Sequence, residues 1–253
     1  MYDASKRLMS ERPWIFTAAI IIGWFAIGLG TGLLLPQALP GADISVVRAL
    51  GQIALALVAA ALAVGVGWRA VEPAGGRVRD ARLLLLPVLF AALPLAAGLR
   101  IESWSSFAFL VVMELVVGFS EELVFRGFIL RALLPSGMTR AVLVSAALFG
   151  LVHLGNIVYG ASVAVTLFQV VGVFAFGVGM AAVVLRTGAL WPVMLIHALS
   201  NAALRFSYIT PQHLPTPLMS ALVMALMLLY GAALLWRTPH AAAVRAAPAE
   251  RLS

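Results

Sequence analysis

The sequence predicts an all-α protein, a polytopic membrane bundle of about eight transmembrane helices with both termini in the cytoplasm. Of its 253 residues, 63% are hydrophobic and 11% are charged, and the mean hydropathy is +1.05. A soluble domain is about half apolar and about a quarter charged. The apolar residues also gather into runs of the length that crosses the hydrocarbon core, roughly 20 residues each.

Eight apolar segments follow one another, and together they predict one helical domain over residues 14–236. A charged N-terminal segment, 1–13, precedes the first run, which is too long for the apolar part of a signal peptide and is expected to stay as a span. Residues 70–82 form a polar loop, and the Ala-, Arg- and Pro-rich tail at 237–253 is expected to be disordered and cytoplasmic. The expected spans are 14–35, 46–68, 83–99, 104–133, 140–155, 158–185, 189–209 and 215–236.

The basic residues between these spans predict the orientation, because cytoplasmic loops carry an excess of Lys and Arg. Three of them fall on one side: Arg48, Arg100 and Arg205. Thirteen fall on the other: Lys6, Arg7, Arg12, Arg69, Arg77, Arg79, Arg82, Arg131, Arg140, Arg186, Arg237, Arg245 and Arg251. We therefore expect a multi-pass protein of the cytoplasmic membrane with both termini inside.

Composition also excludes several functions. The chain has no cysteine, which rules out thiol catalysis, Cys-ligated zinc and disulfide bonds. The net charge of +7 does not indicate a nucleic-acid partner, because the basic residues follow the topology. A two-aspartate protease is excluded since Asp3, Asp43 and Asp80 lie outside the spans, and the zinc signature His-Glu-x-x-His is absent.

Carboxylates within the spans are the feature that needs a functional reason. Only three of the ten acidic residues lie there: Glu114, Glu121 and Glu122. An ionised side chain at this depth costs a few kcal/mol. Glu122 and Arg126 are four residues apart, which favours an intrahelical ion pair. Glu121 lies about 100° away around the helix and is expected to be free to point into the bundle, and Glu114 is interpreted as structural.

Two histidines lie within the spans at a similar depth. Glu121 comes about a dozen residues before the loop near 134–140 and His153 about a dozen after it, so both lie roughly 18 Å from that loop. His197 lies roughly 15 Å from the loop at 186–188. Asn201 shares a helix face with His197, and Asn156 is expected to orient the His153 ring. Buried ionisable clusters of this kind tend to be sites.

Two chemistries suit one free carboxylate, two imidazoles and an amide. Glu121 can take a proton from water and pass it to a leaving amine, while an Asn N–H stabilises a developing oxyanion. Alternatively, Glu121, His153 and His197 form a three-ligand zinc site with an open position for water. Spacing alone does not choose between them.

The motifs, read in order, resemble the CPBP family, the CAAX-protease and bacteriocin-processing (Abi) intramembrane endopeptidases. They are Glu-Glu-x-x-x-Arg from Glu121, Phe-x-x-x-His from Phe149, and His-x-x-x-Asn from His197. The likeness covers about 104–201 and implies a catalytic core at about 104–209. It implies that Glu121 activates water, that His153 assists, and that His197 and Asn201 form the oxyanion side. Glu122, Arg126 and Phe149 would support them.

The resemblance predicts a protease acting on a membrane-tethered protein or peptide. Such families are described both as metalloproteases and as metal-independent glutamate proteases. We expect no cofactor, because the Asn of the last motif suits an oxyanion donor better than a metal ligand, and zinc is the alternative. We also expect the substrate to approach from the cytoplasmic side. The competing interpretation is a non-proteolytic membrane protein, either a proton-coupled carrier or a partner-binding or immunity scaffold.

Overall fold

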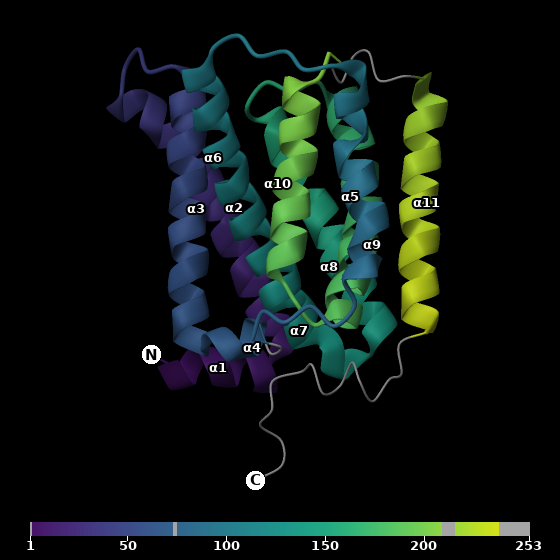
Figure 1. Ribbon diagram of the computed structural model, residues 1–253. Coiled ribbons are helices and arrows are strands. Elements are labelled where there is room, and N and C mark those ends of the chain that lie inside the picture. The colour runs from purple at the N-terminus through teal and green to yellow at the C-terminus, as the bar shows by residue number, and fades with distance from the viewer. Residues whose placement is uncertain (1, 73–74, 209–215, 238–253) are drawn as a thin grey trace.

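The computed structural model describes residues 2–72, 75–208 and 216–237, and this part of the chain is all-helical with no β-strand, as predicted. One isolated backbone bridge joins Leu99 and Ser207. The expected disordered tail lies outside the described residues from 238 onward. The helices form an upright bundle, with the short helix α1 lying across its foot (Figure 1).

The first half of the bundle consists of α1 (Tyr2–Glu11), α2 (Pro13–Ala38), α3 (Ile44–Val66) and the short α4 (Trp68–Val71). Next comes an apolar helical segment, Ala81–Ala97, whose centre is α5 (Leu85–Ala92). Helix α3 ends at Val66, two residues before the end of the expected span 46–68, because Gly67 adopts a φ of 87° that only glycine tolerates easily. Asp43 begins α3 by accepting the N–H of Ser45 at 2.7 Å.

The second half begins with α6 (Trp104–Glu122), which continues into a π-helix (Leu123–Ile129) and α7 (Leu130–Leu133). Then follow α8 (Met138–Val152) with a 3₁₀ extension to Ile157, α9 (Val163–Thr187), α10 (Trp191–Phe206) and α11 (Thr216–Trp236). Ser162 begins α9 by accepting the N–H of Val165 at 3.2 Å. Helix α9 therefore begins five residues after the start of the expected span 158–185, and α10 ends three residues before the end of the expected span 189–209.

Among the described residues, five helices are long and apolar enough to cross a membrane, which supports an integral membrane protein. Of the other three expected spans, Ala81–Ala97 is shorter, α6 carries three carboxylates, and α10 has only 16 residues. The five are Pro13–Ala38, Ile44–Val66, Met138–Ile157, Val163–Thr187 and Met219–Trp236.

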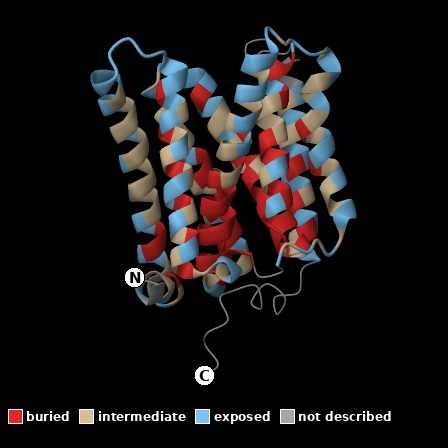
Figure 2. Ribbon diagram, turned by 60° about the vertical axis from the view of Figure 1, so that its left-hand side comes forward, coloured by how far each residue is buried: buried red, intermediate tan, exposed pale blue. Residues whose placement is uncertain are grey.

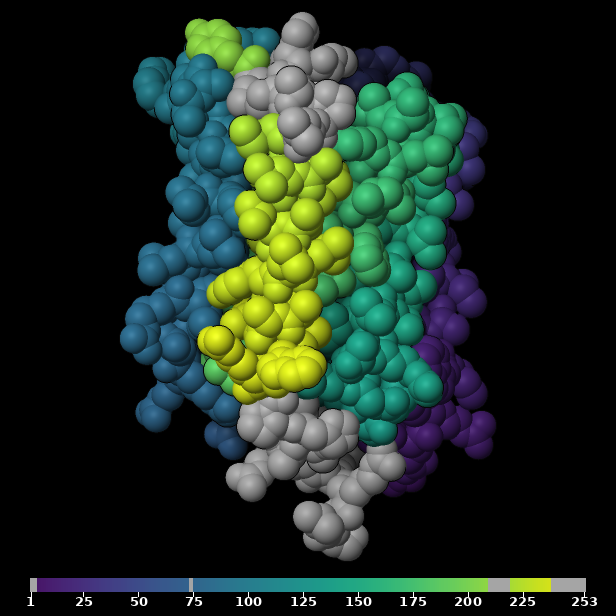
Figure 3. All heavy atoms as spheres, turned by 90° about the vertical axis from the view of Figure 1, so that its right-hand side faces the viewer, coloured from purple at the N-terminus to yellow at the C-terminus, as the bar shows by residue number. Residues whose placement is uncertain are grey.

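Packing divides the helices into two groups. Helix α6 packs along α3 and α10, and α10 also packs along α5. Helix α9 packs along α8 and α11, with α11 on the outside of this group (Figure 3). The consecutive helices α9 and α10 touch little. The candidate site forms where the α6–α10 group meets α8 and α9.

Glycines permit a close helix contact within each of these two groups. A Cβ on Gly118 of α6 would lie 2.5 Å from the backbone oxygen of Met194 in α10. A Cβ on Gly150 of α8 would lie 2.9 Å from the backbone oxygen of Val170 in α9. Small residues of this kind let membrane helices approach closely.

Candidate active site

The two adjacent carboxylates lie where α6 changes into a π-helix. Glu121 and Glu122 are the last residues of α6, and every residue from Leu123 to Ile129 is buried. The wider turn is closed by the N–H of Leu130, which donates to the Phe125 carbonyl five residues back. Ser145 of α8 donates its hydroxyl to the same carbonyl at 2.7 Å. Turns of this kind occur frequently at functional sites.

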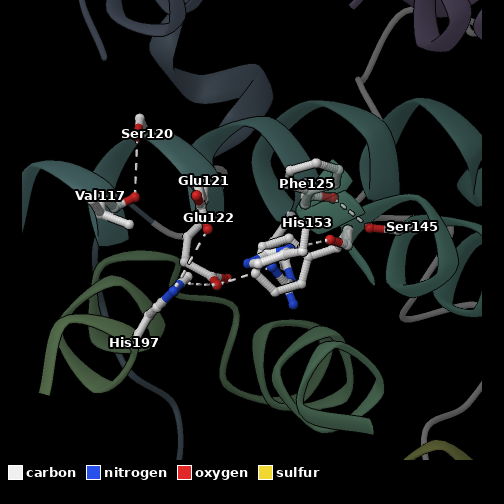
Figure 4. A network of polar contacts seen from close by, with 10 residues as sticks. Val117, Ser120, Glu121, Glu122, Phe125, Ser145, His153 and His197 are labelled. Carbon is white, nitrogen blue, oxygen red and sulfur yellow. Dashed lines mark hydrogen bonds and ion pairs between the residues drawn. The ribbon is translucent and has the colours of Figure 1, made fainter. Parts of the chain in front are cut away.

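Glu122 is held by two donors in a fully buried position. Arg126 Nη1 donates to Glu122 Oε1 at 2.9 Å, and neither side chain is exposed. The predicted i,i+4 pair is therefore present. His197 Nδ1 of α10 lies 2.9 Å from the same oxygen (Figure 4). Because a carboxylate paired with arginine only accepts, Nδ1 carries the proton and Nε2 is the nitrogen turned away from Glu122.

Glu121 faces that second nitrogen. Its Oε2 lies 3.6 Å from His197 Nε2. The Glu121 side chain is 12% exposed, and the His197 side chain is 6% exposed. Glu121 therefore points into the bundle, as expected from the sequence, and it lies beside the same imidazole that Glu122 contacts. The imidazole links the two carboxylates, one of them fixed and the other partly accessible.

His153 is oriented by backbone, not by Asn156 as expected. Its Nδ1 donates to the Phe149 carbonyl at 2.8 Å, because a carbonyl oxygen only accepts. The other ring nitrogen, Nε2, therefore points away from its own helix turn. Asn156 instead donates through Nδ2 to Gln169 Oε1 of α9 at 2.9 Å.

Phe149 lies at the centre of the cluster. The Arg126 guanidinium carbon lies 4.2 Å from the centroid of its ring, within cation–π range. The rings of His153 and His197 meet it edge to face, with centroids 5.2 and 5.7 Å away. One aromatic ring thus sets the spacing of three polar side chains from three helices.

Asn201 lies one helical turn beyond His197 on α10 and is partly exposed. Among the described residues its side chain makes no hydrogen bond. Glu114 belongs to a separate contact, in which Arg205 Nε donates to Glu114 Oε1 at 2.7 Å. That ion pair joins α6 to α10, in agreement with the structural interpretation of Glu114.

Three supporting contacts were not anticipated from the sequence. The ring of Phe176 in α9 meets the His197 ring edge to face, with the two centroids 5.6 Å apart. Gln52 of α3 donates to the hydroxyl of Ser120 at 2.9 Å, beside Glu121. Glu72 is buried and accepts the N–H of Leu190 at 2.7 Å, which fixes the start of α10. A glutamine within an apolar span was the only available signal for any of these contacts.

Within the described residues, no three side chains of His, Asp or Glu converge closely enough to hold a metal ion. His197 Nδ1 is engaged by Glu122, and its Nε2 lies 3.6 Å from Glu121 Oε2.

Comparison with protein families identifies the segment that contains these side chains. Residues 102–203 match the family model described as type II CAAX prenyl endopeptidase Rce1-like. This part of the chain is Rce1-like. The match confirms the resemblance predicted from the motifs and supports a membrane protease of the CAAX type. Glu121, His153, His197 and Asn201 all lie inside the Rce1-like segment. Comparison with curated proteins and with solved structures gave no match.

Proposed function

We propose that the protein is an intramembrane endopeptidase that hydrolyses a peptide bond of a membrane-tethered substrate by means of a glutamate-activated water. The observation that carries this proposal is the position of His197 between Glu122, which Arg126 fixes, and Glu121, which keeps some exposure. An intramembrane carboxylate that is reachable and held beside an imidazole is suited to proton transfer.

Charge balance supports this arrangement. With His197 protonated, the two carboxylates are balanced by one imidazolium and one guanidinium, which limits the cost of burying them. Glu122 and Arg126 hold each other and do not take part in bond making. Glu121 is the carboxylate that can exchange a proton with a reactant.

In the proposed reaction, Glu121 takes a proton from a water molecule as the water oxygen attacks the scissile carbonyl carbon. His153 Nε2 accepts a hydrogen bond from that water and orients it. The carbonyl oxygen becomes an oxyanion, stabilised by the Nε2–H of His197 and the side-chain N–H of Asn201. Glu121 then gives its proton to the leaving nitrogen as the C–N bond breaks, and the enzyme returns to its starting state.

No step of this reaction passes through a metal ion. The proposal therefore differs from the zinc alternative, which requires Glu121, His153 and His197 to converge on one centre. The oxyanion is stabilised by protein N–H groups instead.

The proposed topology has eight spans and cytoplasmic termini. The uneven distribution of Arg and Lys supports it. Spans as short as α10 and Ala81–Ala97 suit a membrane that is locally thinned around the site.

The proposal can be tested with purified protein in lipid nanodiscs and a library of membrane-tethered peptides, with wild type beside Glu121→Gln. Each tethered peptide is matched by an untethered copy of the same sequence, and products are identified by mass spectrometry. We expect wild type to cleave tethered members and the variant to cleave none, because a peptide must reach this depth unwound. Absence of cleavage by wild type across the library would favour a carrier or scaffold.

A further inference from the structure

Packing is unequal between the two ends of the bundle (Figure 2). We call the end that carries α1, α4 and α7 the α1 face, and the end with loops 39–43, 98–103 and 158–162 the opposite face (Figure 1). On the α1 side of the site, every residue from Glu122 to Leu134 is buried, and so is every residue from Gly177 to Leu185. Helices buried on all sides indicate tight packing between the site and the α1 face.

The same helices are loosely packed on the other side of the site. In residues 151–160 no side chain is buried, and in residues 161–174 only Thr166 is. Residues 199–202 of α10, a full helical turn beginning just beyond His197, are all partly exposed. A helix packed inside a bundle buries one residue every three or four. These segments lack such a stripe, so their side chains are only partly covered by neighbouring helices.

Polar side chains line this open half. Gln52, Asn156, Gln169, Ser200 and Asn201 lie in apolar helices at or beyond the level of the site, and each is partly exposed. Polar groups on the α1 side, such as Arg126 and Ser145, are fully buried within the packed core. Amide and hydroxyl groups supply both donors and acceptors, which an extended peptide backbone needs when it enters hydrocarbon.

We propose that the substrate reaches Glu121 from the opposite face, through the loosely packed half of the bundle. This inference rests on the proposed function. With the orientation set by the basic residues, the substrate class is a membrane-tethered segment that enters from the extracytoplasmic half of the bilayer. It replaces the expectation of a cytoplasmic approach, which the packed core beneath the site opposes.

The chain contains no cysteine, so single-cysteine variants report access directly. The matched pair is Ser200→Cys, in the open half, and Ser145→Cys, in the packed half. Ala42→Cys and Arg77→Cys mark the loops of the opposite face and the α1 face. A small membrane-impermeant methanethiosulfonate is added to intact cells or to inverted vesicles, and the remaining thiols are counted after denaturation.

We expect Ser200→Cys to react from the same side as Ala42→Cys, and Ser145→Cys to stay unreacted from both sides. Reaction of either serine variant from the side of Arg77→Cys, or no reaction of Ser200→Cys from either side, would overturn the proposal. If Ser200→Cys does not fold, Gly155→Cys replaces it, since a Cβ there meets no atom within 4 Å. Labelling does not require turnover, so a protein that labels as expected but cleaves nothing would contradict only the proposed function.

Discussion

Replacement of Arg126 by methionine tests the fixed half of the candidate site. The Arg126→Met variant keeps an unbranched apolar side chain but removes the guanidinium that donates to Glu122 at 2.9 Å. It also removes the positive charge over the Phe149 ring. Glu122 then keeps His197 as its remaining donor inside the bundle.

The expected loss of stability follows from the burial of this pair. Removing one partner of a buried ion pair costs about 3–5 kcal/mol. Because His197 still donates to Glu122, we expect the lower end, about 3 kcal/mol. For a domain of this size about 1 kcal/mol shifts the melting temperature by about 2–4 °C, so the variant should melt about 6–12 °C lower.

Thermal unfolding in detergent measures this loss, with Arg82→Met as the matched control. Arg82 also pairs with an acid, Asp80, at 3.1 Å, but its side chain is 87% exposed, so its loss should leave the melting temperature unchanged. The double variant Glu122→Gln/Arg126→Met should recover part of the stability, because it removes the uncompensated charge. Equal melting of Arg126→Met and Arg82→Met would refute a buried structural pair.

Three further predictions concern packing and chemistry. Gly118→Ala should lower both the melting temperature and turnover, because its Cβ would lie 2.5 Å from the Met194 backbone oxygen. Gly23→Ala is the control and should lower neither, because a Cβ there meets no atom within 4 Å. Thermal melting and cleavage rates of both variants test this. Phe149→Leu should reduce turnover more than it reduces stability, since the ring spaces Arg126 and the two histidines, and equal effects on both would contradict this role. Cleavage should persist after dialysis against strong chelators, and restoration of a chelated, inactive protein by zinc would instead favour a metal centre.

Residue spacing was sufficient to predict the contacts that depend on one helix. The Glu122–Arg126 pair follows from an i,i+4 separation, and it is present even though the backbone widens after Glu122. Depth from the loops also placed His153 and His197 near one level, and both rings contact Phe149. These predictions needed only the rise per residue and the order of the helices.

Contacts that depend on how helices face one another could not be predicted. Glu121 of α6 lies beside His197 of α10 because of how these two helices pack, and no spacing in the sequence signals the π-helix that follows Glu122. Asn156 was expected to orient His153, but the chain is 3₁₀-helical there and Asn156 meets Gln169 of α9. Glu72 follows the turn at Gly67, which directs it back under the bundle to Leu190. Tertiary packing decides each of these contacts.

The most direct test of the account compares turnover of Glu121→Gln and Glu122→Gln, each measured on folded protein in nanodiscs with a tethered substrate. General base catalysis contributes about 10²–10⁴-fold, so Glu121→Gln should lose at least about 100-fold in kcat while its melting temperature stays near that of wild type. Glu122→Gln should melt lower, because it removes the negative charge that compensates the buried Arg126 guanidinium. A Glu121→Gln variant that retains wild-type kcat would contradict the central claim.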